Sequence, residues 1–517
     1  MMLTTSLITL PFAGALAVFL LPASKKWVGS LALVVALTEL GIWITGFFGR
    51  HHFDFGSARI QFEQKHTWIS DLGISYHVGL FTFSFWLVGL TTVVMAAAIA
   101  YGLWAGRERA NAYYALMLFL TGAIVCVFSA QDLILFYVAF EAMMIPLYLL
   151  IGVWGGERRV AATFKFVAYT MAGSLLMLVT IVVYGLSHGF DLTTASTSSS
   201  VWLFLGFSVA FTVKAPLFPL HGWLPDAYRE APPEVAAVLS GLISKVAAFG
   251  FLRIVFTKFP DGGAGTPLHD LRALFLALSA TGLIYGSLLA FRAPDFRGVV
   301  AYSSLAQMSL IGLGLFAGGE LALSGSVLQM VNHGLISTAL FLLAGAIESR
   351  ASTGVLERLG GMARGRPILA SLLVAIGVIS LAVPGSSAFA GEFMILAGTL
   401  QRGWGWALAG LVAIVLAAMY MLRLISAVLH RESGEAVPEQ APDLRPAELC
   451  IVGALLAGIL AISVWPAGIG KHSFACLEKT QTVSTAQPST PAQIGLECVS
   501  VTAPVSGNSA TSAGANP

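Results

Sequence analysis

Apolar segments of similar length, separated by short polar connections, fill most of the 517-residue chain. A helix needs about 20 apolar residues to cross the hydrocarbon core of a membrane. Such segments lie at about 3–22, 28–48, 79–104, 112–130, 132–154, 163–187, 202–220, 233–256, 271–291, 299–318, 324–348, 369–400, 405–429 and 447–467. The pattern therefore predicts an all-α polytopic membrane protein with about fourteen transmembrane helices.

Two of these segments contain residues that break helices. Pro216 and Pro219 interrupt one segment, and Pro384 with Gly385 interrupts another five segments later, because proline cannot donate a backbone N–H. Interrupted helices at corresponding positions are typical of transporters built from internal repeats. The predicted organisation is N-terminal helices in 1–111, two inverted five-helix repeats at 112–256 and 271–430, a last helix at 447–467 and a flexible tail at 473–517.

Composition narrows the class of protein. Hydrophobic residues make up 57% of the chain and charged residues only 10%, with a mean hydropathy of +0.83. These values exclude a soluble globular chain and a disordered one. The net charge is +2, and the sequence has no basic run, no zinc-spaced Cys and His cluster and no phosphate-binding loop, so it predicts no nucleic-acid partner.

The basic residues predict the orientation in the membrane. Loops after the odd-numbered segments contain fifteen lysines and arginines, and the other loops contain eight. Because basic loops stay in the cytoplasm, both termini are predicted to face the periplasm. The first segment has no basic residue before its apolar run, which favours a transmembrane helix over a cleaved signal.

The four cysteines divide into two kinds. Cys126 and Cys450 lie in apolar segments, where we expect small buried side chains. Cys476 and Cys498 lie in the tail, which is rich in Ser, Thr, Ala, Pro and Gly and cannot form a packed core. In an oxidising compartment these two could form a disulfide, and two free thiols are the alternative.

Ionisable residues inside apolar segments are the candidate functional residues. A charge in hydrocarbon costs a few kcal/mol and usually marks an ion or proton pathway. Lys245 is about thirteen residues into its helix, roughly 20 Å along it, and Glu141 is roughly 13 Å into its own helix. The candidates are Glu141, Lys214, Lys245, His333 and Glu392.

The chemistry of these residues fits proton transfer, although each also has a structural interpretation. A buried lysine near a carboxylate can gain or lose its proton when its surroundings change, so Lys214 and Lys245 are the natural partners of Glu141. His333 can change charge near neutral pH, or it is a hydrogen-bonded core residue. His221, at the cytoplasmic end beyond the first interruption, is a secondary candidate, and it could equally bond within its loop.

Three lesser cases complete the intramembrane set. Glu39 has no evident partner and belongs either to a pathway or to a local pair. Arg253 and Arg423 could extend to the membrane surface or pair with lipid and loop groups.

Six phrases occur in order between about Ala112 and Leu400. They are FEAMMIPLYLLIGVWGGERR, FKFVAYTMAGSLLML, KAPLFPLHGWLPDA, AYSSLAQMSLIGLG, LQMVNHGLISTALFLLAG and VPGSSAFAGEF. Together they resemble the antiporter-like M subunits of proton-pumping NADH:quinone oxidoreductase, respiratory complex I. The number of predicted helices agrees with that family across the rest of the chain.

The resemblance implies roles for the candidate residues. It implies fourteen helices with two inverted repeats, each containing a half-channel. Glu141 and Lys214 would form the charged pair of the first half-channel, and Lys245 would be the central relay. His333 would lie on the hydrated axis towards the second half, with Glu392 as the terminal proton carrier. Related L and N subunits typically have lysine in place of this glutamate.

The resemblance also implies a proton-translocating subunit in a bacterial inner membrane. This chain would hold no cofactor and no metal, because flavin, iron–sulfur clusters and quinone belong to partner subunits. Its expected partners are other membrane subunits, especially neighbouring antiporter-like ones, and the lipid bilayer. A subunit of a multisubunit cation/proton antiporter or of a membrane-bound hydrogenase is the alternative.

Two positions depart from the family pattern. The family often has histidine where this chain has Gln307, which cannot titrate, so a relay there needs water. After WLPDA the family commonly has APT, whereas Pro232, Pro233 and Glu234 follow Ala231 here.

Overall fold

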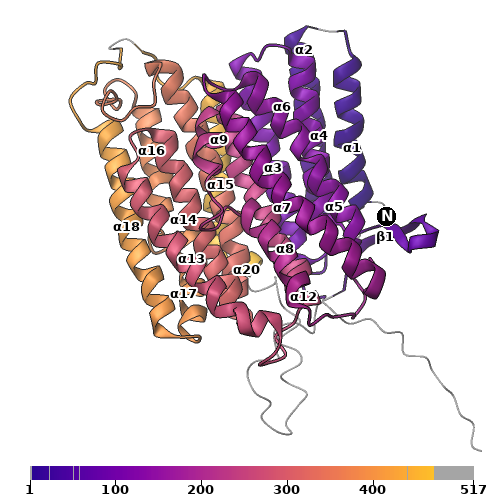
Figure 1. The fold of residues 1–517 in the computed structure, drawn as a ribbon. Helices are drawn as coiled ribbons and strands as arrows, with labels where there is room; N and C mark the ends of the chain where they lie inside the picture. Colours follow the sequence, from indigo (N-terminus) through magenta and orange to yellow (C-terminus); the bar gives the residue numbers. More distant parts are fainter. Residues whose placement is uncertain (1–2, 23, 50–51, 58, 439–440, 471–517) are drawn as a thin grey trace, which may run out of the picture.

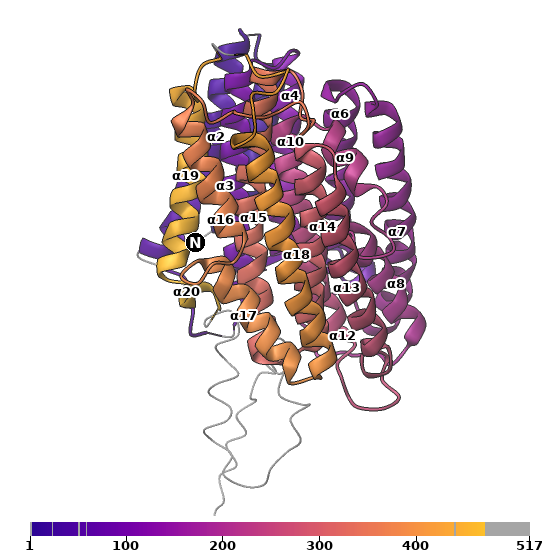
Figure 2. The same cartoon turned by 90° about the vertical axis from the view of Figure 1, so that its left-hand side faces the viewer.

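The computed structural model describes residues 3–22, 24–49, 52–57, 59–438 and 441–470. Long helices lie side by side and roughly parallel, and their connections gather at the two ends of the bundle (Figures 1 and 2). The predicted tail at 473–517, with Cys476 and Cys498, lies outside the described residues.

The described residues up to Glu230 form nine α-helices. They are α1 (Leu3–Leu20), α2 (Lys25–Phe48), α3 (Thr82–Ala105), α4 (Ala110–Ser129), α5 (Leu133–Ala142), α6 (Met144–Trp154), α7 (Arg159–His188), α8 (Val201–Lys214) and α9 (Leu224–Glu230). The next span is continuous but contains two π-helical turns. It consists of α10 (Pro233–Val238), η2 (Leu239–Ile243), α11 (Ser244–Gly250), η3 (Phe251–Val255) and α12 (Phe256–Lys258).

The second half contains long helices with shorter ones among them. They are α13 (Pro267–Arg292), α14 (Phe296–Ala317), α15 (Gly319–Ala351), α16 (Pro367–Ser380), α17 (Ser387–Leu400), α18 (Trp404–Leu429), α19 (Pro446–Val464) and α20 (Ala467–Gly470). The shorter helices are α16, α17 and α20. Among the described residues, twelve helical spans are long and apolar enough to cross a membrane, with α5 and α6 counted together and α10 to α12 counted together. The prediction of a helical, multi-pass membrane protein is confirmed.

Two predicted segments, 202–220 and 369–400, correspond to shorter helices. α8 ends at Lys214, just before Pro216, and the indole N–H of Trp223 donates to the carbonyl of Val213 at 2.9 Å. This bond satisfies one carbonyl of the last turn. α16 ends at Ser380 and α17 begins at Ser387. Gly385 between them has φ +95°, a left-handed conformation that glycine adopts at no steric cost.

The all-α prediction is wrong in one place. The strands β1 (Gln61–Ile69) and β2 (Ile74–Leu80) form an antiparallel hairpin between α2 and α3. Lys65 of β1 lies opposite His77 of β2. The short helix η1 (Ser70–Leu72) and Gly73, with φ +68°, make the turn. The hairpin projects from the side of the bundle next to α1 and α5 (Figure 1).

Two spans are buried along their whole apolar length. They are α15 and the span from α10 to α12, and they pack against each other in the interior of the bundle. By contrast, the outer face of α7 exposes large apolar side chains such as Phe164 at 75% and Val179 at 62%. The interior spans are therefore the ones that carry Lys245 and His333 away from lipid.

Candidate functional site

Lys245 lies on α11, directly after the π-helical turn η2, and its side chain is fully buried. Its Nζ donates to the carbonyl oxygen of Ser240 at 2.5 Å. π-helical turns occur mostly as single turns within α-helices, frequently at functional sites. Here the turn contains Ser240, whose carbonyl oxygen faces the lysine. The arrangement gives the buried nitrogen of Lys245 an acceptor inside the bundle.

His333 on α15 contacts the same lysine. Its Nδ1 is 2.6 Å from Nζ of Lys245, and its Nε2 is buried with no hydrogen-bond partner among the described residues. Both nitrogens of the N–H···N contact can hold a proton. The pair is therefore able to exchange one, and Nε2 of His333 remains to pass it on.

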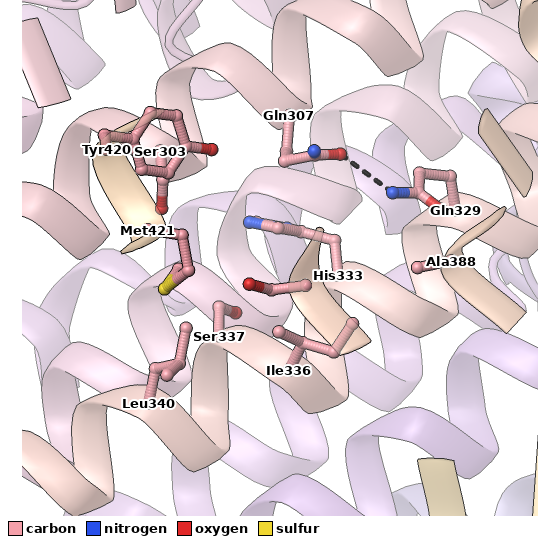
Figure 3. A pocket seen from close by; sticks show the side chains of 11 residues that line it. Ser303, Gln307, Gln329, His333, Ile336, Ser337, Leu340, Ala388, Tyr420 and Met421 are labelled. Atoms are coloured by element: carbon pink, nitrogen blue, oxygen red, sulfur yellow. Dashed lines mark hydrogen bonds between the residues drawn. The ribbon is translucent and has the colours of Figure 1, made fainter. Parts of the chain in front are cut away.

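A small cavity lies beside His333. Its volume is about 20 Å³, enough for one water molecule. Figure 3 shows His333 next to the hydrogen bond between Gln307 and Gln329, with Ser303, Ser337 and Tyr420 around it. Polar groups on several sides make this a suitable place for a bridging water.

Glu392 on α17 lies beyond the amides that border this cavity. Only 5% of the glutamate is exposed, and its Oε1 accepts hydrogen bonds from Nε2 of Gln307 at 2.9 Å and of Gln329 at 3.4 Å. A second cavity of about 10 Å³ is lined by Glu392, Gln307 and Tyr420. Because Gln307 and Tyr420 line both cavities, they separate the His333 side from the Glu392 side.

Lys214 and Glu141 form a different environment. Lys214 is the last residue of α8 and is 1% exposed. Its Nζ lies 3.2 Å from Sδ of Met144 and 4.4 Å from the ring centroid of Phe140. Phe140 directly precedes Glu141 in the sequence, and Met144 follows it by about one helical turn. The ammonium of Lys214 therefore lies beside the carboxylate of Glu141.

Glu141 itself makes no hydrogen bond or ion pair with Lys214 among the described residues. Its Oε1 is buried without a hydrogen-bond partner, although the residue as a whole is half-buried. The exposed residues Val138 and Ile145 flank it on α5 and α6. Glu141 therefore stands at the edge of the bundle, and Lys214 stands inside it.

His221 lies in the connection between α8 and α9. Its ring contacts those of Phe218 and Tyr285, with centroids 5.8 and 5.4 Å away, and its Nδ1 is buried without a partner. Nearby, Lys165 donates to Asp226 at 2.7 Å. His221 makes no hydrogen bond with the other five candidate residues among the described residues.

The structure thus brings the candidates together in two groups. Lys245, His333 and Glu392 are joined directly or through the amides and cavities, and Glu141 with Lys214 forms the other group. No hydrogen bond in the described part of the chain links Lys214 to Lys245.

Two larger cavities open at opposite ends of α15. One, of about 790 Å³, borders Gly345, Glu348 and Arg350 near the C-terminal end of this helix. The other, of about 560 Å³, borders Ser324 and Leu328 near its N-terminal end, together with Ala390 and Met394 of α17. The latter pair flanks Glu392 in sequence.

The sequence interpretation missed the amides Gln329 and Asn332. Asn332 donates from Nδ2 to the carbonyl of Ser387 at 2.8 Å and to Oε1 of Gln329 at 3.5 Å. The signal was present, because Gln329, Asn332 and His333 are spaced to share one face of a helix.

A second missed group surrounds Glu234, which is fully buried. Arg107 binds both carboxylate oxygens at 2.6 and 2.8 Å, and the hydroxyl of Tyr113 donates at 2.5 Å. Glu234, one of the residues that depart from the family pattern, is therefore paired with Arg107 at the start of the span from α10 to α12, which carries Lys245. Charge-assisted bidentate bonds of this kind are strong.

Three expectations about lesser residues are corrected or refined. Arg253 follows the second of its two alternatives: it is fully buried and pairs with a loop group, donating to Oε1 of Gln131, between α4 and α5, at 3.1 and 2.6 Å. Cys450 is exposed, whereas Cys126 is buried as expected. Glu39 is buried, and neither carboxylate oxygen has a hydrogen-bond partner among the described residues.

Within the described ranges, no group of three or more His, Cys, Asp or Glu side chains is placed to hold a metal ion. The site consists instead of isolated ionisable groups linked by amides and hydroxyls. Such a site can move protons between nitrogen and oxygen atoms.

The fold and this row of buried groups define a multi-pass membrane protein with ionisable residues along the interior of its helical bundle. The family described as "NADH:quinone oxidoreductase/Mrp antiporter, TM" matches residues 130–417. NADH-quinone oxidoreductase subunit M of Rickettsia prowazekii is 31% identical over 471 residues, covering 89% of this chain and 95% of the relative. The chain belongs to the family of NADH:quinone oxidoreductase and Mrp antiporter transmembrane subunits.

Solved structures agree with this assignment. A chain of respiratory complex I from Thermus thermophilus with bound NADH aligns with a TM-score of 0.81 and 28% identity, covering 91% of this chain and 98% of that one. A chain of the Mrp complex from Dietzia shares the fold, with a TM-score of 0.78 and 21% identity over 92% and 97% of the two chains. The sequence resemblance to M subunits of complex I is confirmed.

Proposed function

We propose that this chain is the proton-translocating M subunit of an NADH:quinone oxidoreductase, in a bacterial inner membrane with both termini in the periplasm. The observation that carries the proposal is the buried series Lys245, His333, Gln307 and Glu392, joined by hydrogen bonds and water-sized cavities. Intramembrane ionisable groups of this kind mark proton relays. Relatives named subunit M support the assignment.

The proposed architecture has fourteen membrane spans. α8 with the turns after it makes one span, and α16 with α17 makes another, in addition to the twelve long ones. Residues 112–256 and 271–430 would be two inverted repeats, after the helices of 1–111 and before the helix at 447–467. The helix ends at Lys214 and Ser380 support this division, because each falls at the corresponding place in its repeat.

In the proposed mechanism, redox energy released in partner subunits changes the relation between Glu141 and Lys214. Among the described residues, the close contacts of the Lys214 ammonium are a thioether and an aromatic ring, so a small displacement suffices to change its interaction with Glu141. The altered field changes the proton affinity of Lys245. The proton then passes to His333, across the cavity, and to Glu392.

The two larger cavities would supply the route to water. The one at Glu348 and Arg350 is the proposed cytoplasmic side, because that end of the bundle carries the excess of basic loops. The one beside Ala390 and Met394 is the proposed periplasmic outlet for Glu392. His221, at the cytoplasmic mouth of the first interruption, would be a secondary group.

The proposed partners are the other membrane subunits of complex I, above all the neighbouring antiporter-like ones, and the lipid bilayer. The half-buried Glu141 at the outer edge of the bundle supports contact with a neighbouring subunit, since a lone carboxylate facing lipid is costly. Flavin, iron–sulfur clusters and quinone would be held by partner subunits.

Affinity purification of the tagged chain from native membranes tests the proposal. We expect NADH-oxidising subunits with flavin and iron–sulfur clusters to co-purify, and vesicles with this complex to acidify their lumen when given NADH and quinone. Deletion of the chain should abolish the acidification. Purification apart from any NADH-oxidising activity, together with sodium-dependent proton exchange, would instead identify a subunit of a cation/proton antiporter.

A further inference from the structure

Three neutral amides lie between His333 and the carboxylate of Glu392, in a region where the proposed function requires a proton to pass. Nδ2 of Asn332 faces Oε1 of Gln329 at 3.5 Å, Nε2 of Gln329 donates to Oε1 of Gln307 at 2.8 Å, and Nε2 of Gln307 donates to Glu392 at 2.9 Å. Every bond in this series points towards the glutamate. An amide has a donor and an acceptor but cannot store a proton at neutral pH.

The packing of α15 against α17 fixes this arrangement. A Cβ atom added at Gly391 would lie 2.6 Å from Oε1 of Gln329, so glycine at 391 leaves the space that this amide occupies. Asn332 is anchored to α17 through the carbonyl of Ser387 at 2.8 Å. The amides are therefore held by neighbouring helices and are not free to adopt many rotamers.

We propose that Gln307, Gln329 and Asn332 form an amide chain that positions Glu392, and that protonation of Glu392 reverses the direction of hydrogen bonding along it. A carboxylate accepts hydrogen bonds only, whereas a carboxylic acid has one O–H to donate. When Glu392 is protonated towards Gln307, the amide of Gln307 must turn its oxygen to that O–H. Its NH₂ group then faces Gln329, which must turn in the same sense.

The chain has an acceptor at its far end for the reversed state. Oδ1 of Asn332 is buried and has no hydrogen-bond partner among the described residues. A turn of Asn332 would present this oxygen to the NH₂ group of Gln329, and Asn332 would give up its own bond to the carbonyl of Ser387. The reversed chain therefore exchanges the anchor at Ser387 for the bond from Gln329. The orphaned oxygen is costly as it stands, because buried polar atoms are normally bonded.

The amides do not carry the proton themselves. A proton leaving Nε2 of His333 would pass to water in the cavity beside it and then, past Gln307 and Tyr420, to water in the second cavity. The hydronium there would give its proton to a carboxylate oxygen of Glu392. One N–H bond breaks at histidine and one O–H bond forms at glutamate. Two other ionisable side chains lie near this route. Tyr420 lines both cavities, and Lys245 contacts Nδ1 of His333.

Infrared difference spectroscopy on the intact complex tests the proposal. Glutamine side chains would be labelled with carbon-13, and spectra recorded at low and high pH. The carboxyl band of Glu392 is identified by its loss in Glu392→Gln. We expect the labelled amide bands to change together with that carboxyl band in wild type and to remain constant in Glu392→Gln. Amide bands that do not follow the carboxyl band would overturn the proposal.

Variants of Gln307 provide a second readout. Gln307→Met removes the donor at similar volume, and the carboxyl band should move to higher frequency because its hydrogen bond is lost. Gln307→His restores an N–H donor and should bring the band back towards the wild-type position. Gln401→Met, at the end of α17, is the matched control and should leave the band unchanged. An unchanged band in Gln307→Met would contradict the amide chain.

This inference rests on the proposed function only in that Glu392 takes up a proton, and the two fail in distinguishable ways. If wild-type vesicles do not acidify but the amide bands follow the carboxyl band, the function is wrong and the amide chain stands. If vesicles acidify and the amide bands stay constant, the amide chain is wrong and the function stands.

Discussion

Lys214 and Glu392 are both buried charges on shortened helices, Lys214 at the end of α8 and Glu392 within α17, yet their surroundings differ. The ammonium of Lys214 contacts a sulfur atom and an aromatic ring, which give weak polar interactions. The carboxylate of Glu392 accepts two N–H bonds from side-chain amides that are themselves bonded to other groups. One charge is loosely solvated by the protein and the other is held in a directed hydrogen-bond chain.

This difference indicates different tasks. A weakly solvated charge responds strongly to the field of a neighbouring group, because its low-dielectric surroundings screen little. A charge in a bonded chain has a fixed position from which it can receive a proton. Lys214 is therefore suited to respond to a change at Glu141, and Glu392 is suited to take up a proton at one place. Lys245 and His333 lie between these regions.

Lys245→Met should have the largest effect, because it disconnects the two regions. The variant removes the charge at similar volume, and we expect NADH-driven acidification of vesicles to fall about 10²-fold, the contribution typical of a positioned proton donor or acceptor. Lys258→Met is the control, since Lys258 is also buried but bonds the carbonyl of Thr194 at the far end of its span. Similar losses in both variants would show that burial, and not the place of Lys245, causes the defect.

The next largest effect is on thermal stability, where a variant near Glu392 and a variant at Lys214 should differ. Gln329→Met leaves Oε1 of Gln307 without its donor, and an unsatisfied buried polar group costs about 1–3 kcal/mol. Lys214→Met removes a charge that has no oxygen acceptor bonded to it in the described part of the chain, so it should not lower the melting temperature. Thermal unfolding of the complex in detergent measures both. A larger loss of stability in Lys214→Met would contradict the distinction between the regions.

The smallest effect concerns the hairpin, whose strand β2 packs against α5, the helix that carries Glu141 near its other end. Asp191, in the loop before α8, accepts from Nζ of Lys65 at 2.6 Å, and His77 lies 3.4 Å from the same oxygen. Partial burial alone would raise the pKa of Asp191, but hydrogen bonds from His77, Lys65 and Thr193 together hold it below its usual range.

Because the folded state lowers this pKa, the ionised form of Asp191 stabilises the protein above the usual aspartate pKa of about 3.9. That contribution is lost as pH falls through and below this value. The melting temperature of wild type should therefore fall more steeply between about pH 5 and 3 than that of Asp191→Asn. Because Lys65 is largely exposed, its ion pair with Asp191 contributes only about 0.2–1 kcal/mol of this stabilisation. Equal slopes in wild type and Asp191→Asn would contradict this account.

The sequence predicts the spans and the charged candidates well for a physical reason. Apolar length and rare intramembrane charges are local properties, so Lys214, Lys245 and Glu392 stand out without any knowledge of packing. The helix ends near Pro216 and Pro384 are local for the same reason.

Partners could not be predicted, because they depend on how each helix is rotated against its neighbours. Gln329 carries no charge and does not stand out in an apolar segment, although it bonds both Gln307 and Glu392. The inward direction of Arg253 depends on the position of Gln131 at the start of another helix. The hairpin was missed because its strand from Gln61 to Ile69 is mostly exposed and lacks a clear alternation of apolar residues.

The central claim is that Glu141, which Lys214 approaches without bonding, controls proton movement through the rest of the chain. Glu141→Gln in inside-out membrane vesicles tests it, with NADH-dependent quinone reduction and lumen acidification recorded side by side. The account predicts that both fall while the complex remains assembled, since coupled electron and proton transfer stop together. Wild-type rates of both in the variant would contradict the account.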